Sequence, residues 1–257
     1  MGSTKAIDDY AASLPIANIK IQDRSIRYGV PNQQALWRVS TFHTKEPETV
    51  RWITKFKADS VFLDVGANMG LYSMLAAVYS KARVFAFEPE SQNYALLNKN
   101  ISLNKMSDRV IAWCCALSDM STFDRLYMTG LNVASSGHEF GAEVDHNLMP
   151  VKARFAQGSM SSTIDTLIQS KTIPVPNHIK IDVDGIEHLV VKGGMNVLQK
   201  TELQSVLIEI NPHLMEHSQL VADMLGIGFD FDPAQVERAR RKEGSTKDYA
   251  EYIFWRK

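Results

Sequence analysis

The chain has 257 residues, of which 28 are Lys or Arg and 29 are Asp or Glu, so its formal net charge is −1. The hydrophobic fraction of 45% and the charged fraction of 22% are those of an ordinary globular protein, which excludes a disordered, collagen-like or coiled-coil chain. Because the balanced charge gives no electrostatic field for nucleic acid, we expect small-molecule or glycan partners and no nucleic acid.

The sequence predicts neither a membrane segment nor an exported protein. No apolar run approaches the roughly 20 residues that cross a bilayer, and residues 1–10 contain no apolar signal-peptide core. Cys114 and Cys115 are the only cysteines, and two adjacent cysteines lack the spacing of a metal site, so we expect both to be reduced and buried. These features predict a cytoplasmic protein with no stable membrane insertion.

Residues 1–43 are expected to form an N-terminal β-layer. Short alternating segments between residues 17 and 42, such as 36–39, are separated by turn residues at 28–32. A helix is predicted over 46–56, because apolar residues recur there at helical spacing and two Glu side chains lie near its N-terminus.

Residues 44–257 are expected to form one α/β domain. Strands are predicted at 61–65, 84–87, 110–115, 178–183, 205–210 and 249–255, and helices at 71–80, 91–103, 162–169, 187–199 and 212–225. This alternation is typical of right-handed βαβ units around a parallel sheet. Residues 120–157 interrupt it with glycines and short strands, which predicts a β-insertion that carries specificity. The basic run 238–242 is predicted to be solvated, with a rim for an acidic substrate as the alternative.

The loop after the first of these strands has the composition of a nucleotide-type site. The run Asp64-Val65-Gly66-Ala67-Asn68-Met69-Gly70 places backbone amides at a helix N-terminus and glycines where a ligand approaches closely. Its spacing matches neither the G-x-G-x-x-G of dinucleotide sites nor a P-loop. It resembles motif I of class I S-adenosylmethionine-dependent methyltransferases, in which the acidic residue usually lies near the methionine part of the cofactor.

Acidic residues also end the next two strands. Glu88 ends the second strand, where a carboxylate can accept both hydroxyls of a ribose. Ser118 and Asp119 end the third, where the class I fold normally meets the adenine ring; a turn or helix cap is the alternative for Asp119. The predicted cofactor residues are therefore Asp64, Gly66, Ala67, Asn68, Gly70, Glu88, Ser118 and Asp119.

The strand predicted at 178–183 carries charges, although strands covered on both faces are normally apolar. His178, Lys180 and Asp182 share one face. Burial of an unpaired charge is costly, so these groups either pair with one another or face a wet cleft. Because clefts of open α/β sheets lie beyond the carboxyl ends of the strands, Asp182 is the candidate catalytic residue, with Lys180 as its buried partner. The weaker candidates for a base are His178, His138 and His213.

Taken as a set, these segments resemble the FkbM family of methyltransferases. The resemblance runs from about residue 41 to the C-terminus. It is carried by K-E-P-E-T at 45–49, D-V-G-A-N-x-G at 64–70, F-E-P at 87–89, A-L-S-D at 116–119, Ser135-Ser136, I-K-I-D-V-D-G-I-E at 179–187 and E-I-N-P at 209–212. Asp184 departs from the family, which usually has Glu at this position.

The resemblance implies a class I methyltransferase fold, which is a Rossmann-like, doubly wound and mostly parallel sheet. It also implies S-adenosylmethionine as cofactor and methyl transfer to a hydroxyl of a sugar, glycolipid or other small molecule. An aliphatic hydroxyl must lose its proton as the new bond forms, so a carboxylate such as Asp182 is expected within reach. Ser135 and Ser136 resemble a loop that closes near the cofactor or substrate.

The resemblance supplies no metal motif, so no metal is predicted. The alternative is a divalent cation held by Asp182, Asp184 and Glu209 that polarises the hydroxyl.

Three other functions stay open on the sequence alone. A methyltransferase acting on RNA or protein is the first, although the balanced charge and the lack of an Asn/Asp-Pro-Pro-aromatic motif after the fourth strand disfavour RNA. An NAD-dependent oxidoreductase would share Glu88 but require G-x-G-x-x-G. A non-catalytic adenosyl-binding module would need no acid or base at the cleft, and Asp182 argues against it.

Overall fold

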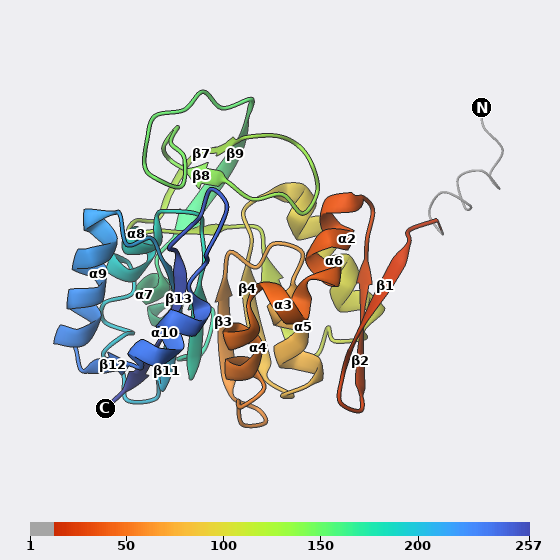
Figure 1. Ribbon diagram of the computed structural model, residues 1–257, viewed down its shortest axis with the longest axis horizontal. Helices are drawn as coiled ribbons and strands as arrows, with labels where there is room; N and C mark the ends of the chain where they lie inside the picture. Colours follow the sequence, from red (N-terminus) through yellow and green to blue (C-terminus); the bar gives the residue numbers. More distant parts are fainter. Residues whose placement is uncertain (1–12) are drawn as a thin grey trace.

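A seven-stranded sheet forms the centre of the computed structural model, which describes residues 13–257 (Figure 1). The strand order is β12-β13-β11-β10-β3-β4-β5. The parallel strands are β3 (Val61–Val65), β4 (Arg83–Phe87), β5 (Val110–Trp113), β10 (His178–Ile181) and β11 (Ser205–Ile210), and the antiparallel β13 (Ala250–Arg256) joins them to β12 (Phe229–Phe231). The strand order reverses between β3 and β10, so the predicted mostly parallel, doubly wound sheet is confirmed.

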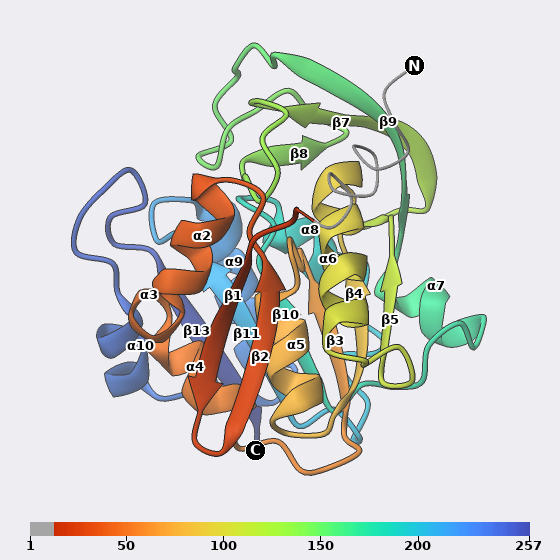
Figure 2. The ribbon, with the colours of Figure 1, turned by 90° about the vertical axis from the view of Figure 1, so that its right-hand side faces the viewer.

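Helices cover both faces of this sheet (Figures 1 and 2). The core on one face contains side chains of α4 (Pro47–Ile53), α5 (Leu71–Val78) and α6 (Ser91–Leu103), and the core on the other contains side chains of α7 (Ile164–Gln169), α8 (Glu187–Lys192) and α9 (Met215–Gly226). Strand residues alternate between the two: Phe62 packs in the first core and Leu63 in the second. Both faces are therefore apolar, as expected for parallel strands.

The N-terminal segment is only partly a β-layer. A hairpin of β1 (Ile16–Ile21) and β2 (Arg24–Gly29) is followed by the helices α2 (Gln33–Ser40) and α3 (Phe42–Lys45). The strand predicted at 36–39 is wrong, because Asn32 caps α2 by accepting a hydrogen bond from the Ala35 amide at 2.8 Å, and Ala35 and Val39 are buried one turn apart. Residues 1–12 of the predicted layer lie outside the described residues.

The segment at 120–157 departs from the main sheet as predicted. Its strands β7 (Thr122–Met128), β8 (His138–Phe140) and β9 (Phe155–Ser162) join β6 (Ala116–Leu117) in a separate four-stranded sheet with the order β6-β9-β7-β8. Figure 2 shows this sheet at the top of the molecule, above the helices and strands of the main layers. We refer to residues 120–157 as the insertion.

Two further expectations fail locally. Residues 229–239 contain β12 and the helix α10 (Pro233–Ala239), neither of which was predicted. Cys115 is buried as expected, but Cys114 is exposed, because β5 ends at Trp113. No helix within residues 13–257 has the length and the apolar character that crossing a bilayer requires.

Candidate active site

A cavity of about 520 Å³ lies at the carboxyl ends of β3, β4 and β10, next to the point where the strand order reverses. Small-molecule sites in proteins typically enclose roughly 300–1,000 Å³. Residues of α2, α3, the insertion and the segment 241–246 complete its walls. Five predicted site residues line it, namely Gly66, Ala67, Asn68, Glu88 and Asp182, whereas Asp64, Gly70, Ser118 and Asp119 do not.

The loop after β3 is held close to its neighbours. The amides of Gly66 and Ala67 both donate to the Phe87 carbonyl at 3.0 Å, which ties the loop to the end of β4. Gly66 has a φ of +77°, and a Cβ added there would lie 1.9 Å from the carbonyl oxygen of Asp182. Only glycine fits this position, which explains why the loop brings the ends of β3 and β10 so close together.

Glu88 places a carboxylate at the cavity wall. Its Oε2 accepts a hydrogen bond from the Asn68 amide at 2.7 Å, and its Oε1 accepts one from the Glu90 amide at 2.9 Å. The residue is only 5% exposed, and burial raises the pKa of Glu88 to about 7. A carboxylate has about four acceptor sites, so each oxygen retains capacity for a further donor.

Asp64 lies beneath the cavity. It is 1% exposed and accepts a hydrogen bond from the Ser73 hydroxyl of α5 at 2.6 Å. Burial raises the pKa of Asp64, and the nearby Lys180 opposes that shift. Asp64 therefore links the start of α5 to the charged groups of β10.

Ser118 and Asp119 lie outside the cavity. The Asp119 carboxylate accepts a hydrogen bond from Lys192 at 2.8 Å, and this bond lowers the pKa of Asp119. A Cβ added at Gly193 would lie 2.1 Å from the Ser118 carbonyl oxygen, so the end of α8 packs directly on this pair. The wall next to Glu88 is formed instead by Pro89, Cys115, Ala116 and Leu117.

Asp182 and Lys180 form a pair, which confirms that two charged groups of β10 are mutually partnered. Lys180 donates to Asp182 Oδ2 at 2.7 Å; its side chain is 2% exposed, while that of Asp182 is 23% exposed. Burial alone would raise the pKa of Asp182, but Lys180 and Lys45 hold the pKa of Asp182 well below its usual range. The Asp182 carboxylate is therefore ionised throughout the physiological pH range and has oxygen surface at the cavity.

A network of buried charges adjoins this pair. Arg241 forms ion pairs with Glu209 and with Glu251, the latter at 3.0 Å, and Lys45 pairs with Glu46 at 2.6 Å. Burial raises the pKa of Glu251 to about 7 and that of Glu209 well above its usual range, although Arg241 opposes both shifts. Arg241 has a side chain only 18% exposed, so the predicted solvation of the basic run is wrong at this residue.

Sequence reasoning assigned no role to four members of this network. Lys45 and Glu46 belong to the K-E-P-E-T segment, which contributed to the family resemblance and was the available signal. Arg241 had no such signal, because it reaches the cavity only through the path of the chain after α10, and Glu251 of β13 joins the network as a partner of Arg241.

Three carboxylates in this region are close enough to be considered as metal ligands. Oxygens of Asp182, Glu187 and Glu209 lie within 4.8 Å of one another. Each already interacts with donors of the chain: Asp182 with Lys180, Glu209 with Arg241, and Glu187 with the amides of Val183 and Gly185 and with His217. These donors compensate the negative charge that a cation would otherwise neutralise.

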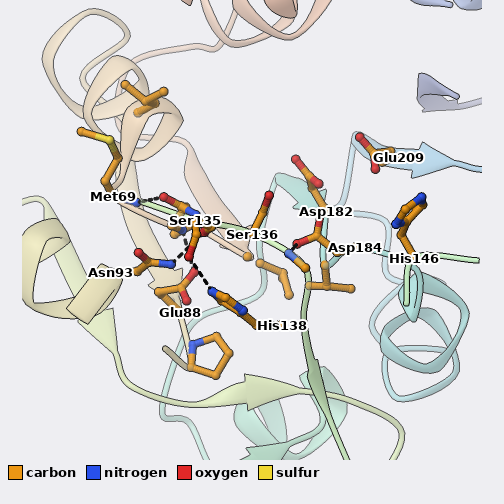
Figure 3. A pocket seen from close by; sticks show the side chains of 18 of the residues that line it. Met69, Glu88, Asn93, Ser135, Ser136, His138, His146, Asp182, Asp184 and Glu209 are labelled. Atoms are coloured by element: carbon orange, nitrogen blue, oxygen red, sulfur yellow. Dashed lines mark hydrogen bonds between the residues drawn. The ribbon is translucent and has the colours of Figure 1, made fainter. Parts of the chain in front are cut away.

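The insertion is attached to both sides of the cavity. Ser135 accepts hydrogen bonds at its carbonyl from the side-chain amides of Asn68 at 2.7 Å and Asn93 at 3.2 Å. The Gly137 amide donates to Asp184 Oδ2 at 2.7 Å. Figure 3 shows Glu88, Asn93 and His138 grouped around Ser135, with the carboxylates of Asp182, Asp184 and Glu209 on the other side. The segment predicted to close near the cofactor or substrate therefore lies in the cavity wall.

Of the three histidines considered as bases, only His138 lines the cavity. Its Nε2 lies 3.0 Å from the Ser135 hydroxyl, and its Nδ1 is buried without a partner among the described residues. His178 stacks on Phe56 with ring centroids 3.8 Å apart, and His213 pairs with Asp248 at 3.5 Å. Neither His178 nor His213 lines the cavity.

Comparison with known proteins identifies the family. Residues 64–232 match the model of the methyltransferase FkbM domain. The chain belongs to the FkbM methyltransferase family.

Individual relatives agree with this assignment to different extents. The chain is 26% identical over 192 residues to the hexuronic acid methyltransferase AglP of Haloferax volcanii, covering 75% of this chain and 73% of that protein. It is 39% identical over 66 residues to a tRNA(Phe) (4-demethylwyosine(37)-C(7)) aminocarboxypropyltransferase of Pyrococcus horikoshii, covering 26% of this chain and 24% of that protein. That similarity is limited to about a quarter of each protein.

The fold is also similar to a solved structure, the methyltransferase FkbM of Methylobacillus flagellatus. The superposition has a TM-score of 0.52 at 14% identity and covers 87% of this chain and 54% of the other. The chain thus spans about half the length of that protein, and the similarity concerns the class I methyltransferase fold.

Proposed function

We propose that this FkbM-family protein transfers the methyl group of S-adenosylmethionine to a hydroxyl of a sugar, glycolipid or other small molecule. The observation that carries the proposal is the position of Glu88. Its carboxylate lies in the cavity beside the Gly66 loop and the N-terminus of α5, where it can accept both hydroxyls of an adenosyl ribose.

The residues present fit the adenosyl group. Glu88 is nearly fully buried, so the hydroxyls of a ribose would provide hydrogen bonds that water would supply only poorly there. Gly66, Ala67 and Asn68 would contact the cofactor through backbone at close range, and Pro89, Cys115, Ala116 and Leu117 would form an apolar slot for the base. Asp64 and Gly70 would act indirectly by shaping the loop. In this proposal Ser118 and Asp119 only support α8.

Methyl transfer needs a nucleophilic oxygen next to an electrophilic carbon. S-adenosylmethionine, when bound, supplies the sulfonium methyl group. That group would provide the carbon for the new bond and its sulfur would leave as the thioether, so this chain would have to take up the proton of the acceptor hydroxyl. We assign this role to Asp182, since its carboxylate is ionised and exposed to the cavity; Lys180 keeps it ionised and fixes its orientation. The insertion excludes water over the reacting groups.

A sugar is the acceptor class that the cavity supports best. The walls away from Glu88 contain the aromatic rings of Trp37, Phe42 and Tyr72. They also contain many side chains that form hydrogen bonds through planar groups, such as carboxylates and guanidinium groups, or through hydroxyls. Such surfaces suit the apolar ring faces and the numerous hydroxyls of a carbohydrate. The similarity over three-quarters of the chain to a hexuronic acid methyltransferase supports the same class.

Titration calorimetry tests the cofactor assignment. We expect saturable binding of S-adenosylmethionine and S-adenosylhomocysteine and none of NAD, because the loop lacks the dinucleotide spacing. Binding of NAD alone, or of no adenosyl ligand, would contradict the proposal. Methyl transfer from labelled S-adenosylmethionine to a panel of glycans would then test the acceptor class.

A further inference from the structure

The cations that line the cavity differ in one respect. Lys45, Lys180 and Arg241 each form an ion pair with a carboxylate. Arg38 of α2 forms no ion pair with any residue in the described range 13–257. It is thus the lining Lys or Arg that has no carboxylate within ion-pair distance among the described residues.

Arg38 is nevertheless held in place. Its Nε donates to the Ala134 carbonyl of the insertion at 2.6 Å, and Asn32, at the start of the same helix, donates to the Val133 carbonyl at 2.9 Å. Arg38 and Asp184 both line the cavity; burial raises the pKa of Asp184, and the Arg38 guanidinium opposes that shift. A fixed guanidinium with free terminal nitrogens is suited to bidentate binding of an anion.

The neighbouring side chains on α2 complete a recognition surface. Trp37 also lines the cavity and is 45% exposed, and Gln34 lies one turn before Arg38 on the same helix. An indole at a cavity mouth offers a broad apolar surface together with one hydrogen-bond donor. A ring that stacked on Trp37 would bring its substituents within reach of Gln34 and Arg38.

The floor of the cavity, which we define as Lys45, Glu46, Lys180, Asp182, Glu209 and Arg241, is rich in carboxylates that already have cationic partners. Arg241 is shared between Glu209 and Glu251, and Asp182 and Glu46 add two more carboxylates beside Lys180 and Lys45. Carboxylates favour hydroxyl donors and repel another anion. An acceptor with both kinds of group would therefore turn its hydroxyls to the floor and its acidic group to Arg38.

We propose that the acceptor is a sugar that carries an acidic group, either a carboxylate or a phosphate ester, which Arg38 binds while the sugar ring lies against Trp37. This inference rests on the proposed methyl transfer to a sugar. It adds the charge of the acceptor, its orientation and the residue that selects it.

Calorimetry on protein saturated with S-adenosylhomocysteine tests the inference. The probes are the methyl glycosides of glucose, galactose and mannose, each as the neutral sugar, the 6-carboxylate and the 6-phosphate. In at least one series we expect an acidic form to bind roughly tenfold or more tightly than its neutral counterpart, because a charged bidentate contact is gained. Preference for the carboxylate or the phosphate identifies the source of the charge.

Three variants distinguish the loss of the Arg38 charge from a general disturbance of the fold. Arg38→Gln should abolish the preference for the acidic sugar, while Arg38→Lys should retain part of it. Asn32→Ser keeps a good helix cap and the hydrogen bond from Arg38 to Ala134, and loses only the hydrogen bond to Val133, so it should keep most of the preference. All three should bind S-adenosylhomocysteine like the parent protein, because α2 supplies none of the side chains assigned to the adenosyl group.

Two results would overturn the inference. One is the absence of any acidic sugar that the parent protein binds more tightly than its neutral counterpart. The other is an undiminished preference in Arg38→Gln. Failure of the parent protein to bind S-adenosylhomocysteine is a separate result, which would contradict the proposed function and this inference with it.

Discussion

The Asp182 carboxylate, directly after the end of β10, lies 2.7 Å from the ammonium of Lys180, two residues earlier in the chain. Lys180 is buried and its ammonium lies 5.3 Å from the centre of the Tyr72 ring, so its charge is compensated mainly by protein groups. The pair therefore fixes a negative charge at the edge of the cavity without leaving a buried positive charge unmatched.

Replacing Asp182 by Asn should lower kcat by roughly 10²–10⁴-fold, because the proton acceptor is lost. Affinity for S-adenosylhomocysteine should change little. The matched control is Asp184→Asn, which alters the neighbouring cavity carboxylate that accepts a hydrogen bond from Gly137. Steady-state kinetics compare the kcat values of the two variants. Full activity of Asp182→Asn would exclude this residue as the base.

Binding of S-adenosylhomocysteine should depend on pH through Glu88. Since burial raises the pKa of Glu88 to about 7, the carboxyl is neutral below that pH and accepts hydroxyl donors poorly. We expect affinity to be roughly tenfold weaker at pH 6 than at pH 8, and this dependence to disappear in Glu88→Gln. At pH 8 the variant itself should bind roughly 10- to 100-fold more weakly than the parent protein.

The control for Glu88 is Asp119→Asn. Asp119 pairs with Lys192 outside the cavity, so the variant should keep parental affinity and the parental pH dependence. Calorimetry at pH 6 and pH 8 measures the affinity of each protein for S-adenosylhomocysteine. A loss of affinity in Asp119→Asn would return this residue to the cofactor site, as the sequence predicted.

Gly66→Ala should destabilise the fold by at least about 2 kcal/mol, since the new Cβ meets a backbone carbonyl and φ is positive. Gly130→Ala is a matched control, because an added Cβ there meets no atom within 4 Å. Urea unfolding of the two variants gives the free energies of unfolding. Similar values for both would mean that the ends of β3 and β10 are not in the close contact described.

Arg241→Gln should lower the free energy of unfolding by about 3–5 kcal/mol at pH 7, because Glu209 and Glu251 lose their buried partner. The loss should be smaller at pH 5. The pKa of Glu251 is about 7 and that of Glu209 is raised, so the two carboxyls carry less negative charge at pH 5 than at pH 7 and depend less on the cation.

The adjacent Arg240 provides the control for Arg241. It pairs with Glu237, whose side chain is 69% exposed, so Arg240→Gln should change stability by no more than about 0.5–1 kcal/mol at either pH. Denaturant titrations at pH 7 and pH 5 compare the two variants. An equal effect of both substitutions would show that the buried network contributes no more than a surface pair.

Features that depend on nearby residues were predictable from the sequence. The loop at Gly66 and the carboxylate of Glu88 follow consecutive parallel strands, and the carboxyl ends of such strands necessarily meet at one edge of the sheet. The pairing of Lys180 with Asp182 followed from their alternation on one strand.

Features that depend on distant segments were not predictable in the same way. Arg241 meets Glu209 and Glu46 only because the chain after α10 returns to the cavity, and a basic run has no local property that reveals this. The segment at 36–39 was misread for a different reason: Ala35 and Val39 are compatible with helical spacing, but the nearby turn residues favoured the alternating interpretation.

The link between the insertion and the Gly66 loop has a consequence for evolution and engineering. Asn68 and Asn93 bind the backbone carbonyl of Ser135, so these two contacts depend on the length of the segment and not on the Ser135 side chain, whose hydroxyl lies against His138 instead. Grafting the insertion of another family member should therefore succeed when the spacing from β7 to this carbonyl is preserved. Such a graft would replace the part of the cavity wall that the insertion supplies, while Arg38 and Trp37 of α2 and the residues around Glu88 stay in place.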